Sequence, residues 1–528
     1  MGLRVFDLQF VAFLATAILS LISILYFYIL ILYPTIFTPL RDIPTPPGRS
    51  LLTGATLRLP GGPHTHDPRY WRETIPNDGL IRFYLVGGRE RLLVTSAKAL
   101  SEILVTKASH FVKPEFVRRR LYYVTGNGLL LAEGEEHSVQ RKSFMPVFSF
   151  RHVKDLYPIF WSKARELTEV LADQIAINNS KKTKRVIEMR QWTSRATLDI
   201  VGLAGMDHDF GSLKDPHSQI IQQYKKMQQS PSLFETLFGV LLSPFAAVKD
   251  ASVVLRVPTR RMKEIKEASR FIRNVCRAII REKQDKADQS SSQIGIDLIS
   301  VALKSDTFSN DALVDQMMTF LAAGHGTTSV ALQWSVYALC KHQDVQQRLR
   351  QEICEQLPLV TDDNVGISAS DIDRLAYLRA FCNEVLRFWP PVPSTIRESL
   401  HDTTVAGHYI PKGTIFSISP AVTNHDAELW GPDANVFDPE RWMREGCANS
   451  GGVKNSHGFL TFIHGPRSCI GDKFARAELA CLVAAIVGRF HFELEDQDKV
   501  EMFTKGGISA APADGIRVYI EVVDGWQA

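Results

Sequence analysis

The sequence predicts a mainly α-helical protein with small β-sheets, preceded by an N-terminal transmembrane helix. Three observations lead to this fold class: an uncharged segment near the N-terminus, long helical periodicity up to about residue 355, and short alternating strands. The 528 residues are 45% hydrophobic and 22% charged, which is typical of a globular domain with a large core. The formal net charge of +4 is too small to indicate nucleic-acid binding.

The first element is the segment of residues 10–33, which contains no charged side chain. As a helix it would span roughly 36 Å, enough to cross a bilayer. A cleaved secretory signal is the alternative, but its apolar region is about 7–15 residues long and ends at small residues. Here the segment ends in aromatic residues, including Tyr28 and Tyr33. We therefore predict an uncleaved membrane anchor over residues 1–33.

A proline-rich connector is predicted over residues 34–49, because its prolines disfavour both helices and paired strands. Residues 50–528 contain no evident linker and are predicted to form one domain. Seven cysteines, an odd number without a Cys-x-x-Cys pair, argue against a disulfide framework. The domain is accordingly predicted to face the reducing cytosol.

Alternating patterns predict strands at residues 80–86 and 91–94. The charged and Ser-rich residues 283–292 are predicted to form an exposed loop. The apolar residues 233–245 are compatible either with a buried helical connection or with a surface that touches membrane or an apolar ligand.

One candidate site lies in residues 321–328, on a helix that opens with Ser309 as N-cap. Two glycines inside a helix cost roughly 1 kcal/mol each, so they require a reason. A ligand approached closely by the backbone is one reason, and a packing contact between core helices is the other. Ala323 and Thr327 share a face, with Gly326 beside them, and His325 points away from that face.

Two charged pairs have patterns that are also common on solvated helix surfaces, so their interpretation depends on the neighbouring residues. Glu384 and Arg387 lie three residues apart on a helix with apolar flanks, where a buried arginine needs a carboxylate, and Arg441 is available to complete a network. His137 and Arg141 share a helix face that suits an anionic group, although a solvated basic face has the same pattern.

The last candidate is Cys469, which follows Arg467 and precedes a helix predicted to start at Asp472. Most lone cysteines are inert and buried. A cation and a helix N-terminus both favour the thiolate, however, so this thiol is predicted to deprotonate easily and to be able to bind a metal.

The pattern formed by Phe462, Gly465, Arg467, Cys469 and Gly471 resembles the haem-binding loop of the cytochromes P450. Residues 323–328 resemble the oxygen-binding helix of that family, and Glu384, Arg387 and Arg441 resemble its structural network. The anchor and the proline-rich connector are similar to those of microsomal, fungal members. The resemblance covers the chain from the anchor to the C-terminus.

The resemblance implies one b-type haem with Cys469 as the axial ligand of its iron. It also implies that His137, Arg141, Arg397 and Arg467 contact the haem propionates, and that Ala323, Gly326 and Thr327 lie at the catalytic face. Members usually carry an acid immediately before the threonine, where this chain has Gly326. We expect water beside Gly324 and Gly326, or a polar group of the substrate, to supply protons instead.

The resemblance therefore predicts a haem-thiolate monooxygenase of the endoplasmic reticulum membrane that acts on a lipophilic substrate such as a terpenoid or polyketide. Its implied partners are an NADPH-dependent flavoprotein reductase and a b-type cytochrome. The alternatives are an isomerase, dehydratase or peroxide-driven enzyme of the same fold, or a non-catalytic haem sensor or carrier.

Overall fold

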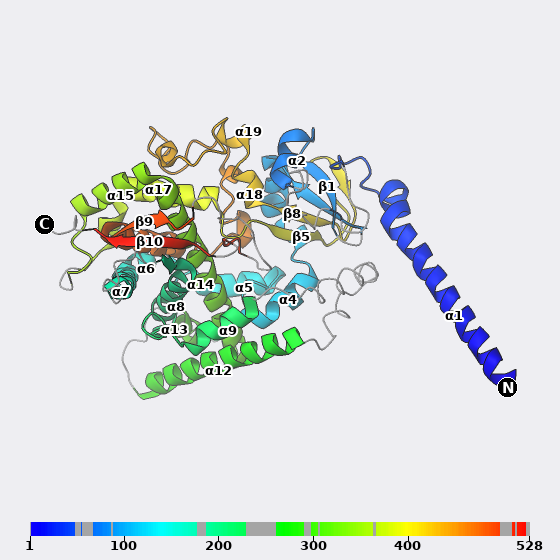
Figure 1. Ribbon diagram of the computed structural model, residues 1–528, viewed down its shortest axis with the longest axis horizontal. Coiled ribbons are helices and arrows are strands. Elements are labelled where there is room, and N and C mark those ends of the chain that lie inside the picture. Colours follow the sequence, from blue (N-terminus) through cyan, green and yellow to red (C-terminus); the bar gives the residue numbers. More distant parts are fainter. Residues whose placement is uncertain are drawn as a thin grey trace. The chain divides into compact units, whose positions relative to one another are not determined.

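The computed structural model describes residues 2–47, 54, 67–85, 88–176, 186–228, 260–289, 297–304, 307–362, 366–496, 509–512 and 515–523. It confirms a mainly helical fold with small sheets (Figure 1). The chain divides into two compact units: residues 1–116, 231–258 and 396–418 form the first, and residues 117–230, 259–395 and 419–528 form the second. The apolar segment 233–245 lies outside the described residues, and a single catalytic domain over residues 50–528 remains a prediction.

The N-terminal helix is longer than the sequence predicts. Helix α1 (Gly2–Phe27) continues into a π-helical segment (Tyr28–Phe37) that contains Pro34. Over Gln9–Phe37 the mean hydropathy is 2.4, and the helix is long and apolar enough to cross a membrane. The expectation that the helix ends before Pro34 is wrong, because the chain continues through Pro34 to Phe37 as a π-helical segment.

The connector after this helix is bound to a sheet in the first unit and is not a free spacer. The Thr38 hydroxyl donates to Glu90 at 2.8 Å, and the Arg82 N–H donates to the Pro44 carbonyl at 2.8 Å. The phenol of Tyr84 donates to the Pro34 carbonyl at 3.3 Å. These contacts anchor the end of the N-terminal helix against β1 (Leu80–Leu85) and β2 (Arg89–Val94).

These two segments form strands, as alternation predicts; they pair antiparallel and belong to a five-stranded sheet of order β1-β2-β8-β5-β3. The other strands are β8 (Ile415–Ile418), β5 (Thr395–Ser399) and β3 (Phe111–Val112). A hairpin of β6 (Thr403–Val405) and β7 (His408–Ile410) lies in the same unit. Helix α2 (Pro68–Thr74) covers the sheet by packing Trp71 against Ile81 and Leu93, and α3 (Ala97–Ser101) follows β2.

The second unit is built around α14 (Asn310–Lys341), whose first N–H groups are capped by the Ser309 hydroxyl, as predicted. It packs against α8 (Met189–Met206), α12 (Arg260–Gln289) and α20 (Asp472–Arg489). Figure 1 shows α12 as a long helix along α9 (Gln219–Gln228). The remaining elements are α4 (Glu115–Thr125), α5 (Gly134–Phe144), α6 (Phe150–Asp155), α7 (Tyr157–Ala176), α13 (Leu298–Lys304), α15 (Gln343–Gln356), α16 (Ala369–Asp373), α17 (Ala376–Phe388), α18 (Pro420–Thr423), α19 (Ala427–Trp430) and the sheet of β4 (Val186–Glu188), β10 (Arg517–Val522) and β9 (Phe490–Leu494).

The charged segment after residue 282 corrects another prediction. Residues 283–289 continue α12 and are not a loop. Lys283 forms ion pairs with Asp297 at 2.6 Å and Asp207 at 3.2 Å, and Lys286 pairs with Glu282 one turn earlier at 2.7 Å. Charge therefore supports this helix end, because each lysine has a carboxylate within reach.

Candidate active site

The loop that carries Cys469 closes on itself through backbone hydrogen bonds. The Cys469 N–H donates to the Phe462 carbonyl at 2.8 Å, and the Ile463 N–H donates to the Leu460 carbonyl at 2.9 Å. Gly465, with φ +79°, opens a short 3₁₀ turn, and Ile463 also lies in the left-handed region with φ +58°. Helix α20 then begins at Asp472, as predicted, so Cys469 lies just ahead of a helix N-terminus.

The environment of Cys469 differs from the prediction in its electrostatics. Burial raises the pKa of its thiol to about 11, and this outweighs the lowering by the Gly471 N–H and by the guanidinium groups of Arg141 and Arg476. The thiol is therefore not easily deprotonated by its protein surroundings alone, and Arg141 and Arg476 are the cations that lower its pKa most. The expectation of an easily deprotonated thiol was based on residues near Cys469 in the sequence. Desolvation depends on all the residues that pack around the thiol in the folded chain, and it is the largest effect on its pKa.

The Cys469 side chain nevertheless has an exposed surface. The Cys469 thiol is surrounded by enough protein for burial to raise its pKa, and it is still accessible. These two properties together indicate that the thiol borders a hollow inside the protein. A metal ion bound there would supply the positive charge that keeps a thiolate ionised. This donor and its hollow fit a thiolate-ligated cofactor.

Among the predicted basic residues, Arg141, Arg397 and Arg467 each form a hydrogen bond or an ion pair, and Arg141 contacts the Cys469 loop directly. Arg141 donates to the Ser468 carbonyl at 2.7 Å, and buried His137 lies one turn before Arg141 on α5. Arg467 forms an ion pair with Glu133 at 2.6 Å. Arg397 belongs to the first unit, where it is buried on β5 and donates to the Ile396 carbonyl at 2.8 Å.

The structure brings the predicted network of Glu384, Arg387 and Arg441 together. Glu384 and Arg387 are completely buried and form a two-pronged pair at 2.8 and 2.7 Å, while Arg441 donates to the same carboxylate at 3.2 Å. The other donors of Arg387 bind three backbone carbonyls at 2.7–2.9 Å, those of Asn424, Ala434 and Val436. All five N–H groups of Arg387 are satisfied, as a buried cation requires.

Three members of this network were missed from the sequence. The Trp442 indole donates to Glu384 at 2.9 Å. The Asn424 side chain donates to the Arg387 carbonyl at 2.9 Å and accepts from the Leu460 N–H at 2.8 Å. The Thr461 hydroxyl donates to the Leu386 carbonyl at 2.7 Å. The network therefore extends to the residues directly before the Cys469 loop. Only Trp442, adjacent to Arg441, carried a sequence signal.

The two glycines of α14 have different surroundings. A Cβ at Gly324 would lie 2.7 Å from the Val201 side chain on α8, so this glycine permits close helix packing. A Cβ at Gly326 would meet nothing within 4 Å. Ala323 is exposed although most of α14 is buried, and the Thr327 hydroxyl donates to its carbonyl at 2.8 Å. The face of Ala323, Gly326 and Thr327 therefore borders open space.

His325 points the other way, as predicted. It is 2% exposed, its ring lies 4.5 Å from that of Tyr224 on α9, and burial lowers its pKa. Phe148 links α14 to the Cys469 loop, since its ring lies 5.6 Å from that of Phe320 and 3.7 Å from a Cβ built on Gly471. The open face of α14 and the thiol thus belong to one packed region of the second unit.

Glu478 on α20 was also missed by the sequence analysis. It is completely buried, and neither carboxyl oxygen has a hydrogen bond of ordinary geometry to any residue in the described part of the chain. Burial raises its pKa well above the usual value, while the nearby Thr328 hydroxyl lowers it. Burial therefore favours the protonated, neutral form of this carboxyl group. Its position in an ordinary amphipathic pattern gave no signal.

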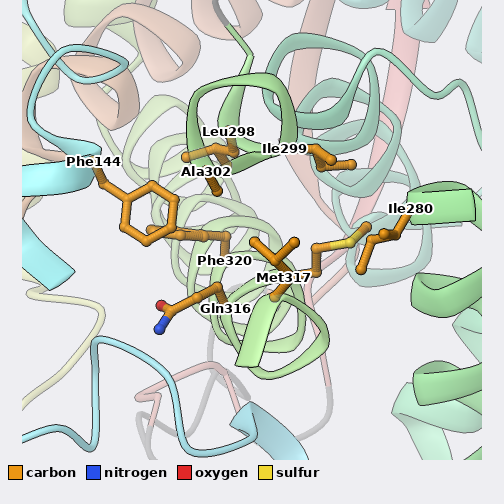
Figure 2. A pocket seen from close by; sticks show the side chains of 9 residues that line it. Phe144, Ile280, Leu298, Ile299, Ala302, Gln316, Met317 and Phe320 are labelled. Carbon is orange, nitrogen blue, oxygen red and sulfur yellow. The ribbon is translucent and has the colours of Figure 1, made fainter. Parts of the chain in front are cut away.

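A small cavity of about 10 Å³ lies among side chains of α5, α12, α13 and α14 (Figure 2). Its lining is apolar except for the amide of Gln316, which accepts from the Leu129 N–H at 2.9 Å. The volume suits about one water molecule and not a cofactor or substrate. This cavity is therefore a packing gap in the core.

The sequence profile of the cytochrome P450 family matches residues 44–518. The cytochrome P450 monooxygenase sphH of Aspergillus fumigatus is 48% identical over 504 residues, which cover 94% of this chain and 91% of the relative. FSL4 of Gibberella zeae is 39% identical, covering 95% and 92%, and FUM15 of Gibberella moniliformis is 36% identical, covering 93% and 90%; both are also named cytochrome P450 monooxygenases. The chain therefore belongs to the cytochrome P450 family, whose members carry a haem-thiolate cofactor. Its enzyme class is that of the P450 monooxygenases.

Proposed function

We propose that this protein inserts one oxygen atom from O₂ into a lipophilic organic substrate, with electrons delivered from NADPH by a flavoprotein reductase. A b-type cytochrome is a further electron donor. The observation that carries the proposal is the deep but accessible thiol of Cys469, in the same packed region as the open face of α14. The fungal relatives support a role in secondary-metabolite biosynthesis, with a terpenoid or polyketide as substrate. The N-terminal apolar helix supports single-pass anchoring in the endoplasmic reticulum membrane, with the catalytic domain in the cytosol.

The proposed cofactor is haem b, which when bound supplies the chemistry of oxygen activation. Cys469 would be its axial ligand, and His137, Arg141, Arg397 and Arg467 would hold its propionates. Arg467 already pairs with Glu133, so it would share its guanidinium between two carboxylates. Phe462, Gly465 and Gly471 would shape the loop. The buried network of Glu384, Arg387 and Arg441 would keep that loop in position through Asn424 and Thr461.

Proton delivery is assigned to the open side of α14. The Thr327 hydroxyl donates its own proton in the hydrogen bond to the Ala323 carbonyl. Its oxygen can therefore accept a hydrogen bond from a proton donor. Water beside Gly326, or a polar group of the substrate, would be that donor. Gly324 plays no part in water entry, because Val201 covers its Cα.

The test is a ferrous–CO difference spectrum of the wild type and Cys469→Ala, combined with product formation in the presence and absence of O₂ and NADPH. A red-shifted Soret band that is present only in the wild type is expected, together with product that requires both O₂ and NADPH. Product formed without them would support the isomerase, dehydratase or peroxide-driven alternatives, for which the absence of an acid at Gly326 is the argument. A cofactor-loaded protein with no turnover beside a competent reductase would support a sensor or carrier.

A further inference from the structure

Two histidine rings are in contact at the start of the Cys469 loop. His457 belongs to a short 3₁₀ turn (Ser456–Gly458), and His464 stands five residues before Cys469. Their ring centres are 4.9 Å apart, and the ring planes are tilted by 54°. Both residues are partly exposed, so a small solute can reach the pair. Simple aromatic contact is one explanation of this arrangement, and the hydrogen bonds of the two rings point to another.

These hydrogen bonds fix the tautomer of each ring. The Asn455 Oδ1 atom accepts from the His457 backbone N–H at 2.9 Å and lies 3.1 Å from His457 Nδ1, so this ring nitrogen is the donor. His464 Nε2 lies 3.1 Å from the Phe459 carbonyl, which can only accept, so this nitrogen also donates. In the neutral rings the other nitrogens, His457 Nε2 and His464 Nδ1, therefore each carry a lone pair.

The lone pair of His457 has no partner in the protein. His457 Nε2 is buried and makes no hydrogen bond with any residue in the described part of the chain. Burial lowers the pKa of His457, and the neighbouring His464 lowers it further, so the ring is a neutral acceptor at pH 7. A buried acceptor without a donor destabilises the folded state unless something binds to it.

A second pair of histidines, His110 and His401 in the first unit, is a useful comparison. Its ring centres are 4.4 Å apart. His110 Nδ1 is buried without a partner, and within the described ranges no hydrogen bond fixes the tautomer of either ring. Ring contact alone therefore does not determine which nitrogens are free, whereas the hydrogen bonds of His457 and His464 do.

A histidine that binds a metal ion through one nitrogen usually donates the N–H of its other nitrogen to a carbonyl or carboxylate, which fixes the ring. Both His457 and His464 meet this condition. A tetrahedral ion about 2.1 Å from one nitrogen of each ring would place the ring centres about 5 Å apart, and the observed distance is 4.9 Å. We propose that His457 Nε2 and His464 Nδ1 bind a divalent transition-metal ion such as Zn²⁺, with water at its other positions.

The ligand set determines which ions fit. No third histidine, cysteine or carboxylate joins the pair in the part of the chain that the structure describes. Imidazole suits Zn²⁺, Cu²⁺ and Ni²⁺, whereas Ca²⁺ and Mg²⁺ require several oxygen ligands. The ion would connect the 3₁₀ turn to the loop five residues before Cys469. It would restrict the motion of that loop without taking part in the reaction at Cys469, whichever reaction this is.

The probe is Zn²⁺, added to the full-length, haem-loaded protein in detergent, without a polyhistidine tag and after removal of free metal ions. Isothermal titration calorimetry at neutral pH gives the dissociation constant, and all variants are compared at matched haem content. The wild type is expected to bind one Zn²⁺ and no Mg²⁺. His457→Ala and His464→Ala should each weaken Zn²⁺ binding by at least about tenfold. His401→Ala, from the other histidine pair, is the control and should bind as the wild type does.

Asn455→Asp provides a test in the opposite direction. Asn455 is exposed, and aspartate keeps an oxygen acceptor for both N–H groups of His457. A carboxylate acceptor makes the ring a stronger ligand, so Zn²⁺ binding should tighten several-fold, a result that loss of structure does not produce. Zn²⁺ should also slow amide hydrogen exchange in the Cys469 loop of the wild type, and should not do so in His457→Ala.

The proposal is overturned if the wild type does not bind Zn²⁺, or if either His457→Ala or His464→Ala retains the affinity of the wild type. It is also overturned if His401→Ala loses binding, because the ion would then lie at the other pair, or if Asn455→Asp weakens binding. Failure of the monooxygenase assignment would be seen separately, since Zn²⁺ binding is measured without O₂-dependent turnover.

Discussion

Arg387 is the residue whose replacement tests the buried network most directly. Its five N–H groups make five hydrogen bonds at 2.7–2.9 Å, and the side chain is completely buried. Lysine has three N–H donors, so Arg387→Lys leaves at least two of these acceptors without a donor. Each buried orphan costs about 1–3 kcal/mol, which predicts a loss of about 2–6 kcal/mol in the free energy of unfolding. A typical total is about 5–15 kcal/mol, so the loss is large.

The assay is urea unfolding of the full-length protein in detergent, followed by far-ultraviolet circular dichroism at matched haem content. Arg379→Lys is the control, because Arg379 is exposed on the same helix, and it should change the free energy of unfolding by less than about 0.5 kcal/mol. A loss of under about 0.5 kcal/mol for Arg387→Lys would show that the buried network does not stabilise the fold.

Two further predictions concern α14 and α20. Gly324→Ala should lower the free energy of unfolding by about 1–3 kcal/mol, because the new Cβ meets Val201 at 2.7 Å, whereas Gly326→Ala should leave it unchanged or raise it by up to about 1 kcal/mol; equal losses in urea unfolding would contradict this. Glu478 has a folded-state pKa raised above its unfolded value of 4.5, so the folded state binds the proton more tightly. Its contribution to stability is therefore complete below pH 4.5 and is lost as the pH rises toward the folded pKa. Glu478→Gln should make the free energy of unfolding depend less on pH between 5 and 8, and an unchanged slope would refute the assignment.

The helices at the site were predictable because their signals are local. Ser309 caps α14, prolines follow α17, and Gly471 precedes α20, so each boundary is set by residues within one turn. The pairing of Glu384 with Arg387 follows from their spacing of three residues on a helix. Arg441 joins them from a segment more than fifty residues away, and its place rested on resemblance to a family and not on local chemistry.

The properties that the sequence could not predict depend on tertiary surroundings. The pKa of Cys469 is set by burial against its neighbours, and a nearby cation in the sequence, Arg467, is bound to Glu133 instead. Glu478 has a polar side chain at a position that looks solvent-facing, and the packing of α20 against neighbouring helices, including α7 and α14, removes it from water. The different surroundings of Gly324 and Gly326 likewise depend on where α8 lies.

Ile463 has a consequence for how the Cys469 loop can be used. A β-branched residue at φ +58° is in a conformation that costs about 1–3 kcal/mol, so the sequence of the loop opposes its own shape locally. Three hydrogen bonds hold the loop in this shape. The Ile463 N–H donates to the Leu460 carbonyl and the Cys469 N–H donates to the Phe462 carbonyl, while the Asn424 amide oxygen, outside the loop, accepts from the Leu460 N–H. A synthetic peptide of residues 462–471 would therefore relax to other conformations, and a graft of these ten residues onto another scaffold would not reproduce the loop. The motif is a reliable signature of its family without being a self-sufficient building block.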